Sequence, residues 1–189
     1  MRYIPNVGLN ERLQQAAPEL AVALRLVWGR KSYHVDCHVA ALWGLVVATL
    51  PKSIVEIGVR KGDSTTILAH AAKTVGAKML SVDIVPCPGA VRRIADLGLV
   101  DTITFSCTGS RAAAETVADE SVDLIYIDGD HKEAGVQADI EAWTPKLKDG
   151  ATVIAHDFER PGVKKPFRAT GWPIIFLRGE PSLAILQKR

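Results

Sequence analysis

The spacing of apolar residues along the chain changes at Pro51. Before it, apolar residues recur three and four positions apart, as on the buried face of a helix. Residues 39–50 form the broadest such stretch, and Pro51 ends the predicted helix. After Pro51, short β-rich runs alternate with stretches of helical spacing. We therefore expect an N-terminal helical cover over residues 1–51 and an α/β core over residues 52–189, together forming one structural domain.

The predicted core alternates strands with helices, which favours a doubly wound α/β fold with a mostly parallel sheet and helices on both faces. Asp149-Gly150 is expected to turn the chain into the last parallel strand. Two more β-rich runs, 173–177 and 183–186, predict a C-terminal antiparallel hairpin at one edge. Ligands in such sheets bind at the carboxyl ends of the strands. The predicted parallel strands span residues 53–57, 78–83, 102–105, 122–127 and 151–155.

Composition narrows the class of protein. Among 189 residues, 23 basic residues nearly balance 21 acidic ones, and a net charge of +2 gives no electrostatic footprint for nucleic acid. The apolar run 39–50 is interrupted by Gly44 and is too short to cross a bilayer, and the first residues lack the build of a signal peptide. Cys37, Cys87 and Cys107 form no Cys-x-x-Cys pair and are expected to be free thiols. We expect a cytoplasmic protein with neither a nucleic-acid nor a membrane partner.

The segment after the first predicted strand has the features of a ligand-binding loop. Gly58 and Gly62 let the backbone pass close to a ligand, and the helix expected from about Ser64 presents unpaired N–H groups. A dinucleotide fingerprint would need glycine where Arg60 stands, and arginine crowds a pyrophosphate there. Glu56 would repel a phosphate, but it can accept hydrogen bonds from the ammonium group of an amino acid. The alternative is a tight turn that binds nothing.

These residues resemble class I S-adenosylmethionine-dependent methyltransferases, which have a Rossmann-like fold. Glu56-x-Gly58-x-x-x-Gly62 looks like their first motif, and Asp83 closes the second strand where the family binds the ribose hydroxyls. Relatives often carry Gly-Asp-Ser after the third strand; here the acid is missing and Ser110 alone matches. The resemblance implies S-adenosylmethionine as cofactor. The cofactor-binding residues that it implies are Glu56, Gly58, Gly62, Ser64, Asp83, Ser110 and Asp128.

The fourth predicted strand runs into Asp128-Gly129-Asp130-His131. This segment is similar to the Asp-Gly-x-His segment of a subfamily that includes enzymes related to macrolide-sugar O-methyltransferases and cephalosporin-biosynthesis proteins. The resemblance covers roughly residues 53–168 and implies a hydroxyl acceptor on a small molecule or sugar. His131 is the candidate catalytic base, because imidazole takes up protons near neutral pH. Asp128 would position the cofactor, the acceptor or a metal. A structural role for His131 is the alternative.

A divalent metal is a further candidate ligand. Asp128, His156 and Asp157 end the fourth and fifth predicted strands, which lie about 5 Å apart if the strands are neighbours. Catechol-type O-methyltransferases hold magnesium with Asp, Asp and Asn at the corresponding positions. Here His156 replaces an acid, and imidazole suits zinc, nickel or iron better than magnesium. In the alternative interpretation, His156 and Asp157 cap the strand and form only local hydrogen bonds.

Two rival functions stay open at this point. One is a nicotinamide-dependent oxidoreductase on a similar sheet, against which Arg60 counts. The other is a non-catalytic S-adenosylmethionine-binding protein or partner subunit, and a homo-oligomer is compatible with the sequence. His34, Cys37 and His38 have helical spacing for a metal site, but a solvent-facing or lid-helix position is favoured for them.

Overall fold

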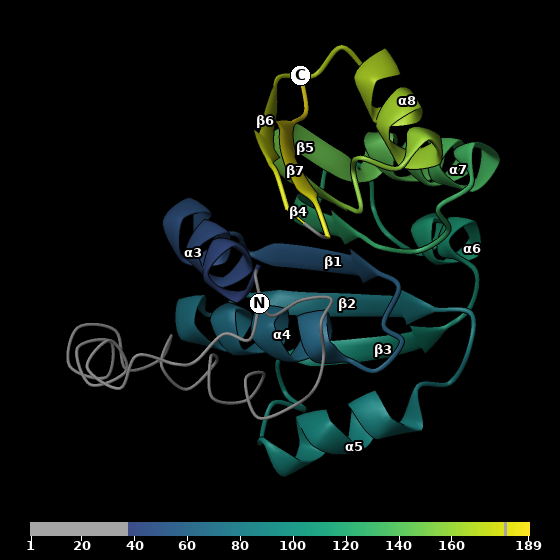
Figure 1. The fold of residues 1–189 in the computed structure, drawn as a ribbon. Coiled ribbons are helices and arrows are strands. Elements are labelled where there is room, and N and C mark those ends of the chain that lie inside the picture. Colours follow the sequence, from purple (N-terminus) through teal and green to yellow (C-terminus); the bar gives the residue numbers. More distant parts are fainter. Residues whose placement is uncertain (1–37, 180) are drawn as a thin grey trace.

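The protein is built around one seven-stranded sheet, seen in a computed structural model that describes residues 38–179 and 181–189 (Figure 1). The strands are β1 (Ser53–Ile57), β2 (Lys78–Asp83), β3 (Ile103–Cys107), β4 (Val122–Ile127), β5 (Leu147–His156), β6 (Ile174–Leu177) and β7 (Leu183–Gln187). Their order across the sheet is β3-β2-β1-β4-β5-β7-β6. Strands β1 to β5 run parallel, while β7 pairs antiparallel with β5 and β6. The predicted fold class is confirmed.

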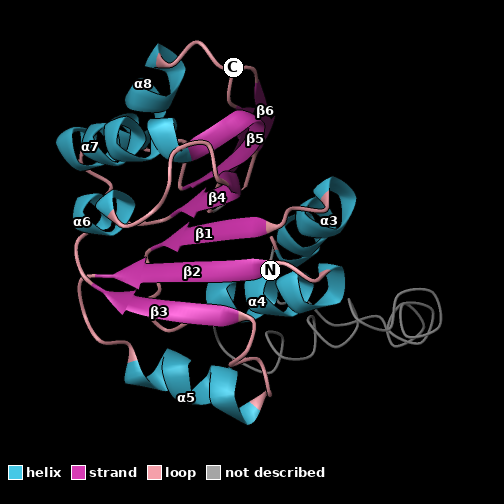
Figure 2. Cartoon of the chain, turned by 180° about the vertical axis from the view of Figure 1, so that it is seen from behind, coloured by secondary structure: helices cyan, strands magenta, loops and turns pink. Residues whose placement is uncertain are grey.

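Helices cover both faces of this sheet, as Figure 2 shows from behind. One face packs against α3 (Val39–Thr49), α4 (Asp63–Val75) and α5 (Pro88–Asp96). The other packs against α6 (Ser110–Glu115), α7 (Glu133–Trp143) and α8 (Pro161–Ala169), and η1 (Thr144–Lys146) follows α7. The predicted helical cover falls mostly on residues 1–37, outside the described residues. Its last part, α3, shares a core with α4.

The strand order reverses between β1 and β4, and this reversal positions the candidate site at the carboxyl ends of the parallel strands. From β1 the chain proceeds to β2 and β3 on one side, then returns to β4 and β5 on the other, which opens a crevice at the carboxyl ends. Ile57 pairs with Val82 and with Ile127, and Ile127 pairs with Ala155. The residues that follow these four are Gly58, Asp83, Asp128 and His156.

The start of β5 differs from the prediction. The strand begins at Leu147, four residues before the expected Ala151, and Asp149-Gly150 lies inside it. The pairing with β4 shifts register there, so that these residues form an irregularity in the ladder instead of a turn. Gly150 has a φ of +79°, which explains why the local pattern resembled a turn.

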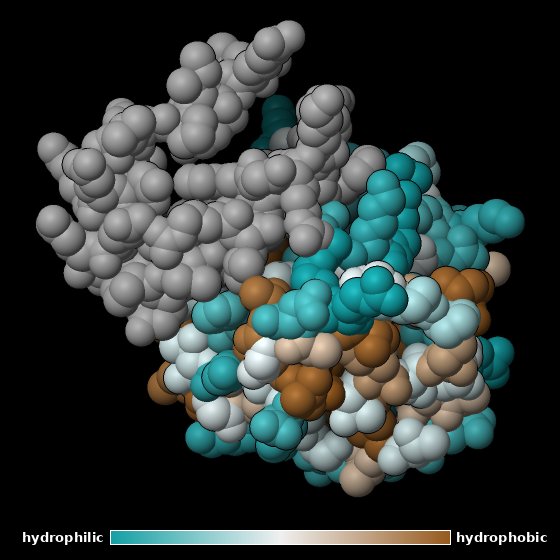
Figure 3. Space-filling model, turned by 90° about the horizontal axis from the view of Figure 1, so that it is seen from below, coloured by the Kyte–Doolittle hydropathy of each residue, from teal (hydrophilic) through white to brown (hydrophobic). Residues whose placement is uncertain are grey.

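The surface mixes polar and apolar side chains. Seen from below, apolar residues are interspersed with hydrophilic ones across the described part of the surface (Figure 3). Within residues 38–179 and 181–189, no helix has both the length and the apolar character needed to cross a membrane.

Candidate active site

Two glycines shape the loop that follows β1. Gly58 has a φ of +92° and Gly62 a φ of +76°, conformations that favour glycine. A Cβ at position 58 would overlap the carbonyl oxygen of Asp128, and one at position 62 would lie 2.5 Å from the Cβ of Ala90. The loop therefore packs tightly against the end of β4 and against α5.

Asp83 ends β2 and binds the backbone of this loop. Its Oδ2 accepts the N–H of Val59 at 2.8 Å and of Arg60 at 3.0 Å, and its Oδ1 accepts the N–H of Val85 at 3.1 Å. Burial opposes ionisation, but the N–H groups of Arg60, Val85 and Val59 outweigh it and lower the pKa of Asp83 below its ordinary value. A carboxylate has about four acceptor positions, so Oδ1 retains room for a further donor.

Glu56 lies behind the loop instead of in it. The side chain is fully buried, and its two oxygens accept hydrogen bonds from the hydroxyls of Ser64 and Ser81, both at 2.7 Å. Burial raises the pKa of Glu56 to about 7, against the effect of these hydrogen bonds. In this position Glu56 ties the start of α4 and the middle of β2 to β1. Its contact with a cofactor stays a prediction.

The start of α6 is fixed by a bond from α7. The hydroxyl of Ser110 accepts the indole N–H of Trp143 at 2.9 Å. Asp139, also on α7, is buried nearby, and burial raises the pKa of Asp139 while Ser110 opposes this rise. Ser110 was predicted from the sequence as a site residue, but Asp139 was not, because its position in a helix resembles that of an ordinary polar residue.

A cavity of about 890 Å³ opens at the carboxyl ends of the strands, within the size range of small-molecule sites. Glu56, Gly62 and Ser64 do not belong to its lining and support the loop instead. Arg160, Arg111 and Asp139 also line it and were not among the predicted site residues. The predicted residues that line it are Gly58, Asp83, Ser110, Asp128, His131, His156 and Asp157.

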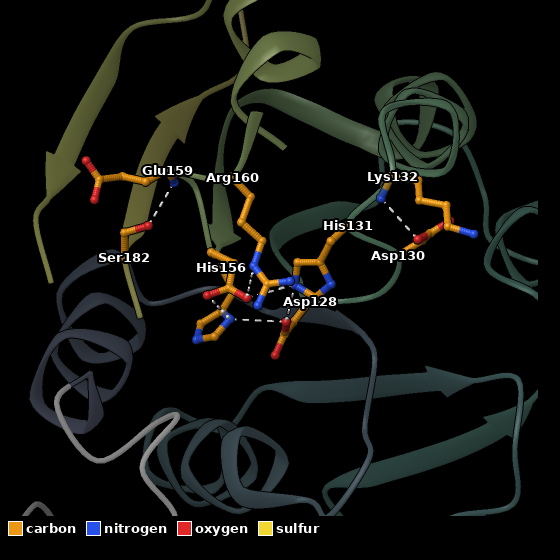
Figure 4. A network of polar contacts seen from close by, with 9 residues as sticks. Asp128, Asp130, His131, Lys132, His156, Glu159, Arg160 and Ser182 are labelled. Carbon is orange, nitrogen blue, oxygen red and sulfur yellow. Dashed lines mark hydrogen bonds and ion pairs between the residues drawn. The ribbon is translucent and has the colours of Figure 1, made fainter. Parts of the chain in front are cut away.

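At one end of the cavity, a carboxylate and two imidazoles converge (Figure 4). Oδ1 of Asp128 lies 3.1 Å from Nδ1 of His156 and 3.4 Å from Nε2 of His131. The ligand atoms of these three residues all lie within 4.8 Å of one another. Asp157, which was predicted from the sequence to ligate a metal with Asp128 and His156, is not part of this group of three, and its role as a ligand stays a prediction. The triplet can accept a proton or bind a cation.

Asp157 and Arg160 border the triplet. Oδ2 of Asp157 lies 3.1 Å from Nε2 of His131 and 2.9 Å from Nε of Arg160.

Burial disfavours the charge of Asp128, but His131 and His156 more than compensate and lower the pKa of Asp128 to about 2. The site therefore contains an ionised Asp128 at neutral pH.

His38, from a distant part of the chain, packs against the site. It precedes α3, is 5% exposed, and its ring meets that of His156 edge-on with centroids 5.8 Å apart. Burial has the largest effect and the nearby His156 the next largest, and together they lower the pKa of His38 to about 4. The negative charge of Asp157 acts in the opposite direction. The solvent-facing position expected for His38 is thus wrong, while His34 and Cys37 lie outside the described residues.

Comparison with known proteins gives one family match. The family described as a methyltransferase domain matches residues 55–158. Among curated proteins, a stretch of 47 residues is 45% identical to the uncharacterized protein y4gI of Sinorhizobium fredii. That stretch covers 25% of this chain and 5% of y4gI.

Solved structures resemble the whole chain in fold. A cofactor-bound Rv0187 from MTB has a TM-score of 0.73 at 17% identity, covering 100% of this chain and 99% of that one. An O-methyltransferase from Bacillus cereus in complex with SAH has a TM-score of 0.72 at 16% identity, with 96% and 97% covered. The SAH-bound methyltransferase PaMTH1 of Podospora anserina has a TM-score of 0.72 at 13% identity, with 100% and 99% covered.

The family match runs from β1 through β5, and it therefore includes the glycine loop, Asp83 and the Asp128 triplet. Because this match spans more than half of the chain, the protein belongs to the methyltransferase domain family and is an enzyme with a Rossmann-like methyltransferase fold.

Proposed function

We propose that the protein transfers a methyl group from S-adenosylmethionine to a hydroxyl oxygen of a small molecule or sugar. The observation that supports this most strongly is the cavity at the switch in strand order, with the glycine loop and the ionised Asp83 at its wall. Its size suits a nucleoside together with a small acceptor. The fold neighbours that hold SAH or a cofactor, and the resemblance to macrolide-sugar O-methyltransferases, support the same proposal.

In this proposal different residues of the cavity bind the cofactor and the acceptor. Gly58 and Asp83 bind the amino-acid portion and the ribose of the cofactor, with Ser110 near the adenine. The cofactor, when bound, supplies a methyl group activated on a sulfonium centre. The Asp128–His131 end would hold the acceptor hydroxyl in line with this methyl group and take up the proton that the hydroxyl loses, with S-adenosylhomocysteine as the leaving group.

Arg60 disfavours a dinucleotide in the same cavity. It has a φ of +47° and lines the cavity at the position where the dinucleotide fingerprint needs glycine.

The free thiols of Cys87 and Cys107 are consistent with a cytoplasmic location.

Titration calorimetry with S-adenosylhomocysteine tests the proposal on the full chain. We expect saturable binding of one molecule per chain and no binding of NAD⁺. Absence of any heat of binding with the nucleoside, on protein shown to be folded by circular dichroism, would overturn the proposal. A screen of hydroxylated acceptors with labelled S-adenosylmethionine then identifies the acceptor class.

A further inference from the structure

The donor atoms of the Asp128 triplet do not fit magnesium. Magnesium requires oxygen ligands in a nearly ideal octahedron and keeps several waters. Two of the three donors here are imidazole nitrogens, Nε2 of His131 and Nδ1 of His156. Imidazole favours zinc, cobalt, nickel or iron over magnesium. Two histidines and one carboxylate with open positions also form the ligand set of many iron(II) sites.

We infer that Asp128, His131 and His156 form a site for a divalent transition-metal ion at the acceptor end of the cavity. The inference rests on the proposed function only for the location of the acceptor. It assigns His131 as a metal ligand and thereby replaces its interpretation as a free base. Such an ion, when bound, lowers the pKa of a hydroxyl that reaches it.

The two separations from Asp128 agree with a shared ion. Ligand atoms at about 2.1 Å from a metal lie about 3.0 Å apart at a right angle and about 3.4 Å apart at a tetrahedral angle. Oδ1 of Asp128 lies 3.1 Å from the nitrogen of His156 and 3.4 Å from that of His131. Both imidazoles approach this one oxygen, as the ligands around a common centre do.

The orientation of His131 supports a common centre over a simple ion pair. Among the described residues, its Nε2 is inaccessible to solvent and forms no hydrogen bond of acceptable geometry. Yet carboxylate oxygens of Asp128 and Asp157 lie only 3.4 Å and 3.1 Å away. A buried nitrogen that lies close to carboxylate oxygens without a hydrogen bond to them is suited to ligate an ion that it shares with Asp128.

The surroundings suit a bound cation and leave it reachable. Asp157 lies beside His131 without belonging to the triplet. Arg160 pairs with Asp157 and holds that carboxylate in place at 2.9 Å. All three residues line the cavity, so that an ion bound by them would lie at its wall.

The test uses the full chain after removal of metals with a chelator. Calorimetry with ZnCl₂, CoCl₂ and MgCl₂ compares affinities, and the visible absorption of Co²⁺ reports nitrogen ligation. We expect one Zn²⁺ or Co²⁺ per chain and binding of Mg²⁺ that is weaker by at least about a hundredfold, because imidazole ligands disfavour it.

Variants separate the metal site from the cofactor site. His131→Ala should lower the Co²⁺ affinity by at least about tenfold and change the absorption spectrum. Lys132→Ala, an exposed neighbour, should change neither. S-adenosylhomocysteine should bind all three proteins alike. Equal Co²⁺ affinity in wild type and His131→Ala, or no Zn²⁺ or Co²⁺ binding by protein that binds S-adenosylhomocysteine, would overturn the inference. Loss of S-adenosylhomocysteine binding alone would count against the proposed function instead.

Discussion

Glu56 and Asp83 lie on adjacent strands, yet their surroundings move their pKa values in opposite directions. Glu56 is enclosed by β1, β2 and α4 and accepts hydrogen bonds from the hydroxyls of Ser64 and Ser81, but burial dominates and raises the pKa of Glu56 to about 7. Asp83 is less enclosed and accepts three backbone N–H groups, which lower its pKa. The first carboxyl is therefore adapted to hold the fold together, and the second to remain charged at the cavity.

This contrast predicts a pH-dependent stability that depends on Glu56. The native state holds the Glu56 proton up to a pH of about 7, whereas the unfolded state releases it near 4.5. Stability from this group is therefore full below pH 4.5 and is lost as the pH rises through 7. From pH 5 to pH 8, the free energy of unfolding should fall by on the order of 2 kcal/mol more in wild type than in Glu56→Gln. Urea unfolding at several pH values measures this, with the exposed Glu115→Gln as control. Parallel pH profiles for wild type and Glu56→Gln would contradict it.

Replacement of Asp83 by asparagine should weaken cofactor binding. The change removes the negative charge of the carboxylate that accepts hydrogen bonds from the N–H groups of Val59 and Arg60. The same carboxylate would accept a hydrogen bond from a ribose hydroxyl. Loss of a charged hydrogen bond costs about 1.5–3 kcal/mol, so the dissociation constant for S-adenosylhomocysteine should rise roughly ten- to a hundredfold. Calorimetry on Asp83→Asn and on the exposed control Asp101→Asn measures the difference. Equal affinities in the two variants would show that Asp83 does not contact the nucleoside.

At the scale of elements, the β1 loop and the end of β4 are fitted to each other through Gly58. Gly58→Ala places a Cβ against the carbonyl oxygen of Asp128 in a backbone conformation that disfavours alanine. We expect a loss of unfolding free energy on the order of 3 kcal/mol. Gly44→Ala in α3 is the matched control, because its Cβ would meet no atom within 4 Å; it should stabilise by up to about 1 kcal/mol. Similar destabilisation by both changes in thermal unfolding would refute the tight fit of the loop.

Elements with strong local signals were predictable from the sequence. β1, β2 and β4 begin and end where the apolar runs and flanking glycines indicated, because both faces of these strands are buried. β5 was not predicted in full, since its first residues pair through an irregular register that leaves no periodic pattern. Asp128 and His156 were placed together correctly because neighbouring parallel strands end at one edge. The position of His38 beside His156 and the place of Arg160 at the site were not predicted, because only the packing of distant segments brings these residues there.

At the scale of the whole molecule, the cavity joins the two halves of the sheet. Its wall takes Gly58 and Asp83 from the β1–β2 side and Asp128 and His156 from the β4–β5 side, while the hairpin of β6 and β7 lies at the far edge. A ligand in the cavity contacts both halves at once. When the concentration of S-adenosylhomocysteine is a hundred times its dissociation constant, binding should add about 2.7 kcal/mol to the free energy of unfolding. The melting temperature should then rise by roughly 5–10 °C.

The same geometry predicts where S-adenosylhomocysteine slows hydrogen exchange. At short exchange times local openings dominate, so protection should rise in residues 58–62, 83–86 and 108–111, the segments that follow β1, β2 and β3 and bring Gly58, Asp83 and Ser110 to the cavity. Residues 174–177 of β6 should exchange as before, because their edge position keeps them away from the ligand. Mass spectrometry of exchange with and without the nucleoside measures both regions in one sample. Uniform protection of β6 and the loops at these times would mean that the ligand acts only through global stability, and the cavity would then not be the place where it binds.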